Sequence, residues 1–123
     1  NDDGNLFDAA SLAAIAALKD AKFPEYDAKA GCVIYTKRTK TSLPIKELPI
    51  EVTVIKIKGK YLLDPSIEEW KCLDARLTVG TMENGTICAM QKGGSKSLSR
   101  DDLAKMIDIA TEHAKKLRKV LDK

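Results

Sequence analysis

The carboxylates of the sequence are densest in one short segment, which contains Asp64, Glu68, Glu69 and Asp74. Carboxylates that bracket a loop can bind Mg²⁺ or act as general acid and general base. Helix capping and solvated loop charge explain the same spacing equally well. Both interpretations stay open on these residues alone.

Two further stretches have a composition that suits phosphate. Asp3, Gly4 and Asn5 lead into an alanine-rich run, and the backbone N–H groups at a helix N-terminus often receive phosphate. Residues 92–96 (KGGSK) are rich in glycine and lysine, but they lack the Walker A spacing, in which Ser or Thr follows the lysine and a helix begins. We therefore expect residues 92–96 to form a flexible link.

The counts of histidine and cysteine limit other chemistry. His113 is the only histidine, so the chain cannot form a His-paired triad or a multi-histidine metal site by itself, and we place it on a helix surface. Cys32, Cys72 and Cys88 lie far apart and match no zinc or redox spacing. We predict no metal, no cofactor, and buried reduced thiols in an intracellular protein with a cytoplasmic location.

The bulk composition is that of an ordinary globular chain. Its 123 residues suffice for one domain, or for a small domain and part of another. The net charge of +3 permits an anionic partner such as RNA without arguing for one. Basic residues of the middle of the chain could contact RNA phosphates, with solvated surface as the alternative: Lys37, Arg38, Lys40, Lys46, Lys56, Lys58 and Lys60. The apolar run 9–18 is too short to span a bilayer.

The elements that must position the candidate residues begin with this apolar run. Asp8 is suited to be its N-cap. Residues 9–18 are apolar almost all round, which predicts a buried helix. A short β-prone run at 32–35 and a polar, basic connection at 36–48 follow, so we place a domain boundary near Leu48.

From Ile50 onward the pattern predicts a sheet and a covering helix. A hairpin at 50–63 is followed by a helical turn capped by Asp64 or Ser66, a strand at 73–82, and a tight turn at Asn84-Gly85 into a strand at 86–90. Ser99 and Asp102 form a capping box for an amphipathic helix at about 100–121. The fold class is α+β, with a buried Ala-rich helix and a four-stranded, largely antiparallel sheet under a long C-terminal helix.

Five segments in this order resemble the RNase PH family, and within it the non-catalytic ring subunits of archaeal RNA exosomes: NDDGNLFDAASLAAIAAL (1–18), LPIEVTV (48–54), YLLDPSIEE (61–69), LDARLTV (73–79) and NGTICAMQKGG (84–94). The resemblance covers nearly the whole chain. It implies an RNase PH-like fold in which residues 1–48 end a first domain, whose N-terminal part is missing from this chain, and residues 49–123 form the second.

The sequence departs from the active members of that family at two places. They carry a Gly-Ser-Arg or Gly-Ser-Ser type loop that binds the attacking phosphate, whereas here Gly4 is followed by Asn5, Leu6 and Phe7. Leu and Phe offer no donor to a phosphate oxygen, and no nearby residue replaces the forked guanidinium of arginine. The resemblance therefore implies a degenerate phosphate loop.

The acidic loop departs as well. Active members place an aspartate a few residues after the counterpart of Asp64, whereas Glu68, Glu69 and Trp70 occupy this loop here, with Trp70 near the expected acid. The resemblance thus implies no catalytic residue in this chain.

Its implied function is a non-catalytic structural and RNA-path subunit of an exosome-type 3′→5′ RNA-degrading hexameric ring. Its implied partners are an active RNase PH-like subunit, RNA passing through the assembled ring, and, as candidates, cap proteins with RNA-binding domains. Two alternatives stay open. One is an active phosphate-dependent 3′→5′ exoribonuclease that uses Asp64, Glu68 or Glu69 with Mg²⁺, and the other is a free-standing RNA-binding module.

Overall fold

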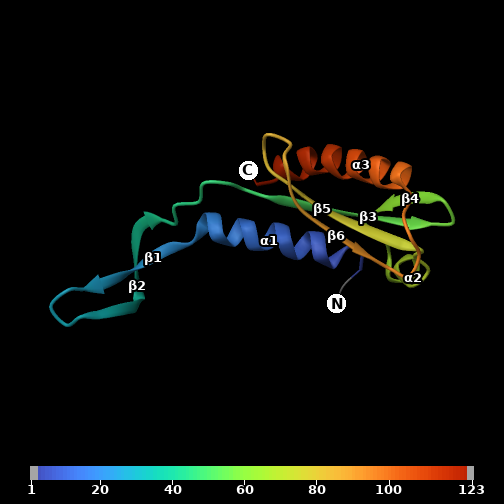
Figure 1. Cartoon of the computed structure of the whole chain (residues 1–123). Helices are drawn as coiled ribbons and strands as arrows, with labels where there is room; N and C mark the ends of the chain where they lie inside the picture. The colour runs from blue at the N-terminus through green and yellow to red at the C-terminus, as the bar shows by residue number, and fades with distance from the viewer. Residues whose placement is uncertain (1–2, 122–123) are drawn as a thin grey trace.

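The computed structural model describes residues 3–121, so the first two residues of the family motif, Asn1 and Asp2, lie outside the described residues, as do Asp122 and Lys123. Nine elements follow one another along this part of the chain (Figure 1): α1 Leu6–Asp20, β1 Lys22–Asp27, β2 Cys32–Ser42, β3 Ile50–Ile57, β4 Lys60–Leu63, α2 Ile67–Lys71, β5 Ala75–Thr81, β6 Ile87–Gly93 and α3 Arg100–Arg118. None of the helices within residues 3–121 is long and apolar enough to cross a membrane.

A four-stranded antiparallel sheet is the centre of the structure. Its strand order is β4-β3-β5-β6, and every neighbouring pair is antiparallel. Lys58 and Gly59 form the two-residue turn between β3 and β4, with φ angles of 46° and 80°. Both residues need positive φ in a hairpin turn of this kind, which matches the right-handed twist of the strands. The predicted turn at Asn84-Gly85 is also present, with Gly85 at φ 84°.

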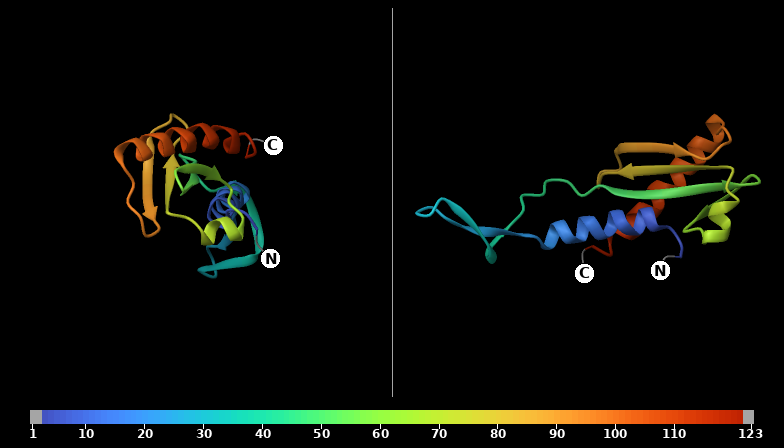
Figure 2. Two further views of the ribbon diagram at one scale, coloured as in Figure 1. Left: turned by 90° about the vertical axis from the view of Figure 1, so that its right-hand side faces the viewer. Right: turned by 90° about the horizontal axis from the view of Figure 1, so that it is seen from below.

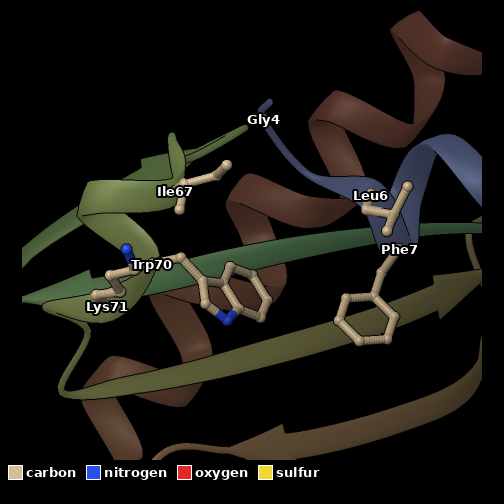
Figure 3. A pocket seen from close by; sticks show the side chains of 6 residues that line it. All are labelled: Gly4, Leu6, Phe7, Ile67, Trp70 and Lys71. Carbon is tan, nitrogen blue, oxygen red and sulfur yellow. The ribbon is translucent and has the colours of Figure 1, made fainter. Parts of the chain in front are cut away.

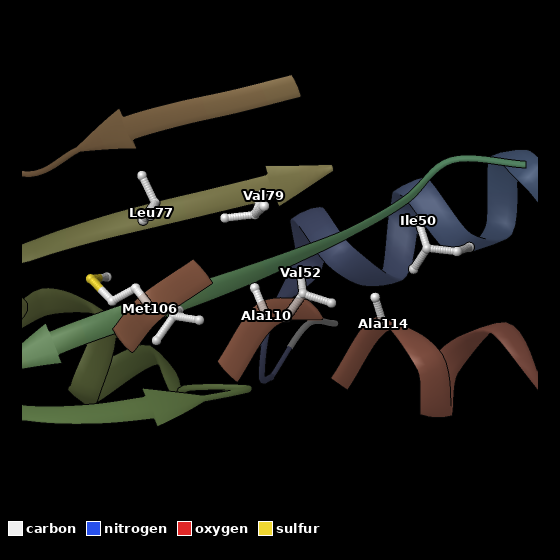
Figure 4. Close-up of a cluster of buried hydrophobic side chains, with 8 residues drawn as sticks. Ile50, Val52, Leu77, Val79, Met106, Ala110 and Ala114 are labelled. Atoms are coloured by element: carbon white, nitrogen blue, oxygen red, sulfur yellow. The ribbon is translucent and has the colours of Figure 1, made fainter. Parts of the chain in front are cut away.

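The core lies between this sheet and α3 (Figures 1 and 4). Alternate residues of β3 and β5 face α3, as the period of two predicts. The residues of α3 that face the sheet are spaced three and four apart. The buried cluster consists of Ile50, Val52, Val54, Leu77, Val79, Met106, Ala110 and Ala114. The predicted α+β class, with an antiparallel sheet covered by a C-terminal helix, is confirmed.

Asp102 connects the start of α3 to the sheet. Its Oδ1 accepts hydrogen bonds from Lys56 Nζ and Tyr61 OH, each at 2.6 Å, and its Oδ2 accepts from Ser99 N at 2.9 Å. Lys56 and Tyr61 are directly opposed in the β3–β4 register, so their side chains reach the same carboxylate. The predicted capping box of Ser99 and Asp102 is present. The Lys56 ammonium and the other donors lower the pKa of Asp102 well below its usual range.

The helix α1 differs from the prediction in its cap and in its burial. Asn5 is the N-cap, because its side chain accepts from Asp8 N, and the helix begins at Leu6. Asp8 is therefore not the cap; its carboxylate accepts from Thr53 N on β3 instead. The prediction that α1 is buried is wrong for this chain, since none of its residues is fully buried. One side of the helix lies along β3 below the sheet, and the rest of its alanine-rich surface faces solvent (Figure 2).

The hairpin β1–β2 projects away from the sheet (Figure 1). Residues 36–42 continue β2, so the first half of the predicted connection at 36–48 is a strand. This part of β2 pairs with β1, although its polar side chains did not indicate a strand in the sequence. The prediction of buried thiols is also wrong. All three cysteines are exposed and free, because they lie in the hairpin, at the C-cap of α2 and on the edge strand β6: Cys32, Cys72 and Cys88.

Residues 92–96 are fixed and do not form the flexible link that we predicted. β6 extends to Gly93, and Lys96 donates its N–H to Asp74 O at 3.0 Å and its ammonium to the Asp74 carboxylate at 2.7 Å. Gly94 has φ 86°, and a Cβ there would lie 2.7 Å from Ala75 Cα. Only glycine fits this close crossing.

We predict that Asp102→Asn lowers the free energy of unfolding at pH 7, because Lys56 loses its carboxylate. The folded pKa of Asp102 is depressed, so its contribution is fully present above the unfolded value of about 3.9 and is lost as the pH falls through the lower folded value. Urea unfolding of wild type and variant should therefore show a stability gap at pH 7 that narrows below about pH 4. A gap that is independent of pH would contradict this assignment.

Candidate functional site

The structure brings together the two segments that the sequence singles out, at the junction of α1 and α2. Asn5 N donates to Asp64 Oδ1 at 2.8 Å, although 59 positions separate the two residues. Gly4 precedes this contact with φ 81°, and a Cβ on Gly4 would lie 2.5 Å from Asp64 Oδ1. Glycine is therefore required where the chain passes the carboxylate.

Two aromatic rings meet at the same junction (Figure 3). The ring centroids of Phe7 and Trp70 lie 5.8 Å apart, with 26° between their planes. Arg76 on β5 places its guanidinium carbon 5.1 Å from the Phe7 centroid and 5.6 Å from the Trp70 centroid. Both distances are within the range of cation–π attraction. One residue from each expected degenerate loop thus packs on the same arginine.

A pocket of about 260 Å³ opens beside the rings (Figure 3). It lies between the start of α1 and α2, and six residues line it: Gly4, Leu6, Phe7, Ile67, Trp70 and Lys71. Apolar carbon makes up most of this lining, and Lys71 is its only charged residue. The pocket therefore suits a flat apolar or aromatic group better than a bare anion.

The four carboxylates of the acidic segment do not converge. Asp64 accepts from Asn5 N, and Glu69 Oε2 accepts from Ser66 N at 2.9 Å in the capping box of α2. Asp74 accepts from Lys58 N and pairs with Lys96, whose hydrogen bond lowers the pKa of Asp74. Glu68 is exposed in the first turn of α2. Within residues 3–121, no three His, Cys, Asp or Glu side chains gather so as to hold a metal ion.

A polar group that the sequence did not indicate lies under the start of α1. Asp8 Oδ2 accepts from Thr53 N at 2.8 Å, and burial raises the pKa of Asp8. Glu51 lies near it, and its pKa is raised by burial and by the charge of Asp8. Thr53 Oγ1 and Thr78 Oγ1 lie 2.8 Å apart in the same layer. Alternation along β3 and β5 places Thr53 and Thr78 on the face opposite the core. No pattern in the sequence indicated that Asp8 contacts Thr53.

His113, which we placed on a helix surface, is half-buried. It lines a second pocket of about 240 Å³ together with Asn5, Asp8 and Asp64. Arg76 was also missed as a site residue. Its position on the outer face of β5 was evident from the alternation, whereas its contact with Phe7 depends on the approach of α1.

We predict that Asp8→Asn raises the melting temperature at pH 7. The amide oxygen can still accept from Thr53 N, and the charge that burial disfavours is removed. The folded pKa of Asp8 is raised, so its charge destabilises the fold increasingly as the pH rises above about 3.9, and the difference between wild type and variant should vanish below that pH. As the control, Asp8→Ala should lower the melting temperature, because Thr53 N loses its acceptor. A lower melting temperature for Asp8→Asn at pH 7 would refute this account.

Known proteins are similar to this chain in sequence and in fold. The family model described as the 3′ exoribonuclease family, domain 2, matches residues 47–113. The chain is 45% identical over 121 residues to the exosome complex component Rrp42 of Methanothermobacter thermautotrophicus, covering 98% of this chain and 45% of that protein. The corresponding protein of Thermococcus gammatolerans is 43% identical, over 97% of this chain and 44% of that protein.

Solved structures agree with this result. An archaeal exosome core matches with a TM-score of 0.84 and 37% identity, covering 100% of this chain and 47% of that chain. An Archaeoglobus fulgidus exosome with RNA bound to the active site matches with a TM-score of 0.80 and 39% identity, over 97% and 44% of the two chains. The chain spans less than half the length of each of these relatives. Because the family model covers more than half of the chain, the resemblance seen in the sequence is confirmed, and this chain belongs to the 3′ exoribonuclease family of RNase PH-like proteins.

Proposed function

We propose that this chain is part of a non-catalytic ring subunit of an exosome-type 3′→5′ RNA-degrading complex. The observation that carries the proposal is the packing of Phe7, Trp70 and Arg76 at the junction of α1 and α2. By the resemblance to active members of the family, we expect their attacking phosphate and catalytic acid at the counterpart of this junction. In this chain the aromatic rings of Phe7 and Trp70 pack against each other between the two loops.

The chemistry of phosphorolysis supports the proposal. A phosphate nucleophile needs hydrogen-bond donors aimed at its oxygens, and the leaving oxygen needs an acid. The side chains of Leu6 and Phe7 supply no such donor. Asp64 and Glu69 already accept backbone N–H groups in the fold, and Glu68 lies exposed on α2. The degenerate phosphate loop (Gly4, Asn5, Leu6, Phe7) and the degenerate acidic loop (Asp64, Glu68, Glu69, Trp70) are part of this proposal.

The proposal includes the domain division. Residues 49–123 form the second RNase PH-like domain, and residues 1–48 end the first. The family match over residues 47–113 supports the boundary, as does the course of the chain, which leaves the hairpin β1–β2 and enters the central sheet at β3.

We infer that the partner is an active RNase PH-like subunit, with RNA passing through the assembled ring. Exposed apolar side chains on α1 and the hairpin support a protein contact there, with Leu18 at 46% and Tyr35 at 78% exposure. The names of the relatives and the RNA in one solved structure support the exosome assignment. Cap proteins with RNA-binding domains and a cytoplasmic location belong to the same proposal and stay predictions.

We expect the purified full-length protein to form a ring with an active RNase PH-like subunit, and to shorten RNA in the presence of phosphate only in that complex. Size-exclusion chromatography with and without the partner measures assembly, and gel analysis of labelled RNA measures shortening. Phosphate-dependent shortening by the protein alone would overturn the proposal. Salt-dependent RNA binding with no partner association would instead favour the free-standing RNA-binding module.

In the reconstituted complex we expect Glu68→Ala and Asp64→Asn to leave turnover unchanged. Asp64→Asn retains an oxygen for Asn5 N, so it tests the charge and preserves the fold. Loss of a general acid or base would cost about 10²–10⁴ in rate. A decrease of that size in either variant, measured by phosphate-dependent release of nucleoside diphosphate, would establish the active-enzyme alternative. Glu68→Gln serves as the matched control for the loss of charge at that position.

A further inference from the structure

We propose that the pocket between α1 and α2 binds one base of single-stranded RNA, stacked on the rings of Phe7 and Trp70. The inference rests on the proposed function and deepens it, because it names the residues by which this subunit contacts RNA. It differs from catalysis, because it requires neither phosphate activation nor a metal.

The rings offer a surface for stacking. Phe7 is 52% exposed, although it is a large apolar side chain, and Leu6 beside it is 59% exposed. Phe7 and Trp70 line the pocket together with Leu6 and Ile67 (Figure 3). A nucleobase presents an aromatic face, and stacking on aromatic side chains is the common way in which proteins hold unpaired bases.

Two cations lie close to the stacking surface, Lys71 on the pocket lining and Arg76 against the two rings. Arg76 lies over both rings and donates to Thr78 Oγ1 at 3.3 Å, and Lys71 lies exposed on the lining. Within residues 3–121, neither cation has a carboxylate within ion-pair distance. Each can therefore attract the phosphates that flank a stacked base. Glu68 is the exposed acid nearby in sequence and limits this attraction.

The size and rigidity of the pocket fit a base better than a protein segment. Its volume of about 260 Å³ is below the ~300–1,000 Å³ of sites for drug-sized ligands. The capping box of α2 fixes one wall, and the contact of Asn5 with Asp64 fixes the other. A partner helix needs a long apolar groove, whereas only six residues line this pocket.

The test uses the fluorescence of Trp70, which is the only tryptophan of the 123 residues. The chain is titrated with a short oligoadenylate and with an abasic ribose-phosphate oligomer of equal length. We expect oligoadenylate to quench Trp70 and to bind about tenfold more tightly than the abasic oligomer, as the loss of a base–aromatic stack implies. Equal affinity for the two oligomers, or no quenching on binding, would overturn the proposal.

Variants test the site by a second route, with labelled RNA and fluorescence anisotropy. Phe7→Leu should lower the affinity for oligoadenylate about tenfold and leave the abasic oligomer unaffected, whereas Tyr35→Leu, which removes an exposed ring from the hairpin, should change neither. Lys71→Gln, a surface change that the fold tolerates, should weaken binding of both oligomers and reduce the salt slope by about one. Circular dichroism checks folding. Equal effects of Phe7→Leu and Tyr35→Leu would contradict a specific pocket.

The two proposals fail separately. If the ring assembles but oligoadenylate does not quench Trp70 fluorescence, the proposed base site is wrong and the proposed ring-subunit function is retained. If Trp70 is quenched by oligoadenylate without any association with an RNase PH-like partner, the ring subunit is wrong and the base site stands. If the partner alone shifts Trp70 emission and abolishes quenching by oligoadenylate, the pocket is a protein interface, and the base site is overturned.

Discussion

One hydrogen bond, from the backbone N–H of Asn5 to the carboxylate of Asp64, determines how α1 meets the sheet. Gly4 allows the approach, because a side chain there would collide with Asp64. The bond helps to hold the first turn of α1 against β3. Phe7 then reaches Trp70 and Arg76, and Asp8 reaches Thr53. This contact thus joins the two loops from which the candidate site is built.

Local patterns were sufficient to predict most of the sheet and of α3. The period of two in β3 and β5, the turn at Gly85 and the capping box at Ser99 each depend on residues close together in sequence. Each of these features is present. The resemblance to the RNase PH family then implied the family fold, which periodicity alone could not.

The errors lie where distant segments or polar surfaces decide the outcome. The sequence predicted Asp8 as the N-cap of α1, but Asn5 is the cap. The carboxylate of Asp8 accepts a hydrogen bond from the backbone of β3 instead. The apolar surface of α1 predicted burial, but burial depends on what covers a helix, and β3 covers only one side. The contact of Arg76 with Phe7 joins elements that are far apart in sequence, so no local pattern could reveal it.

Asp102 also has a consequence for how the chain selects its fold. Lys56 and Tyr61 face each other across the β3–β4 hairpin, and both reach the carboxylate at the start of α3. If the hairpin slipped by one residue, the slipped strand would present its opposite face, and the buried carboxylate would lose Lys56 or Tyr61. The group thus disfavours misregistered pairing of β3 and β4, so that one register of the hairpin is compatible with the docked α3.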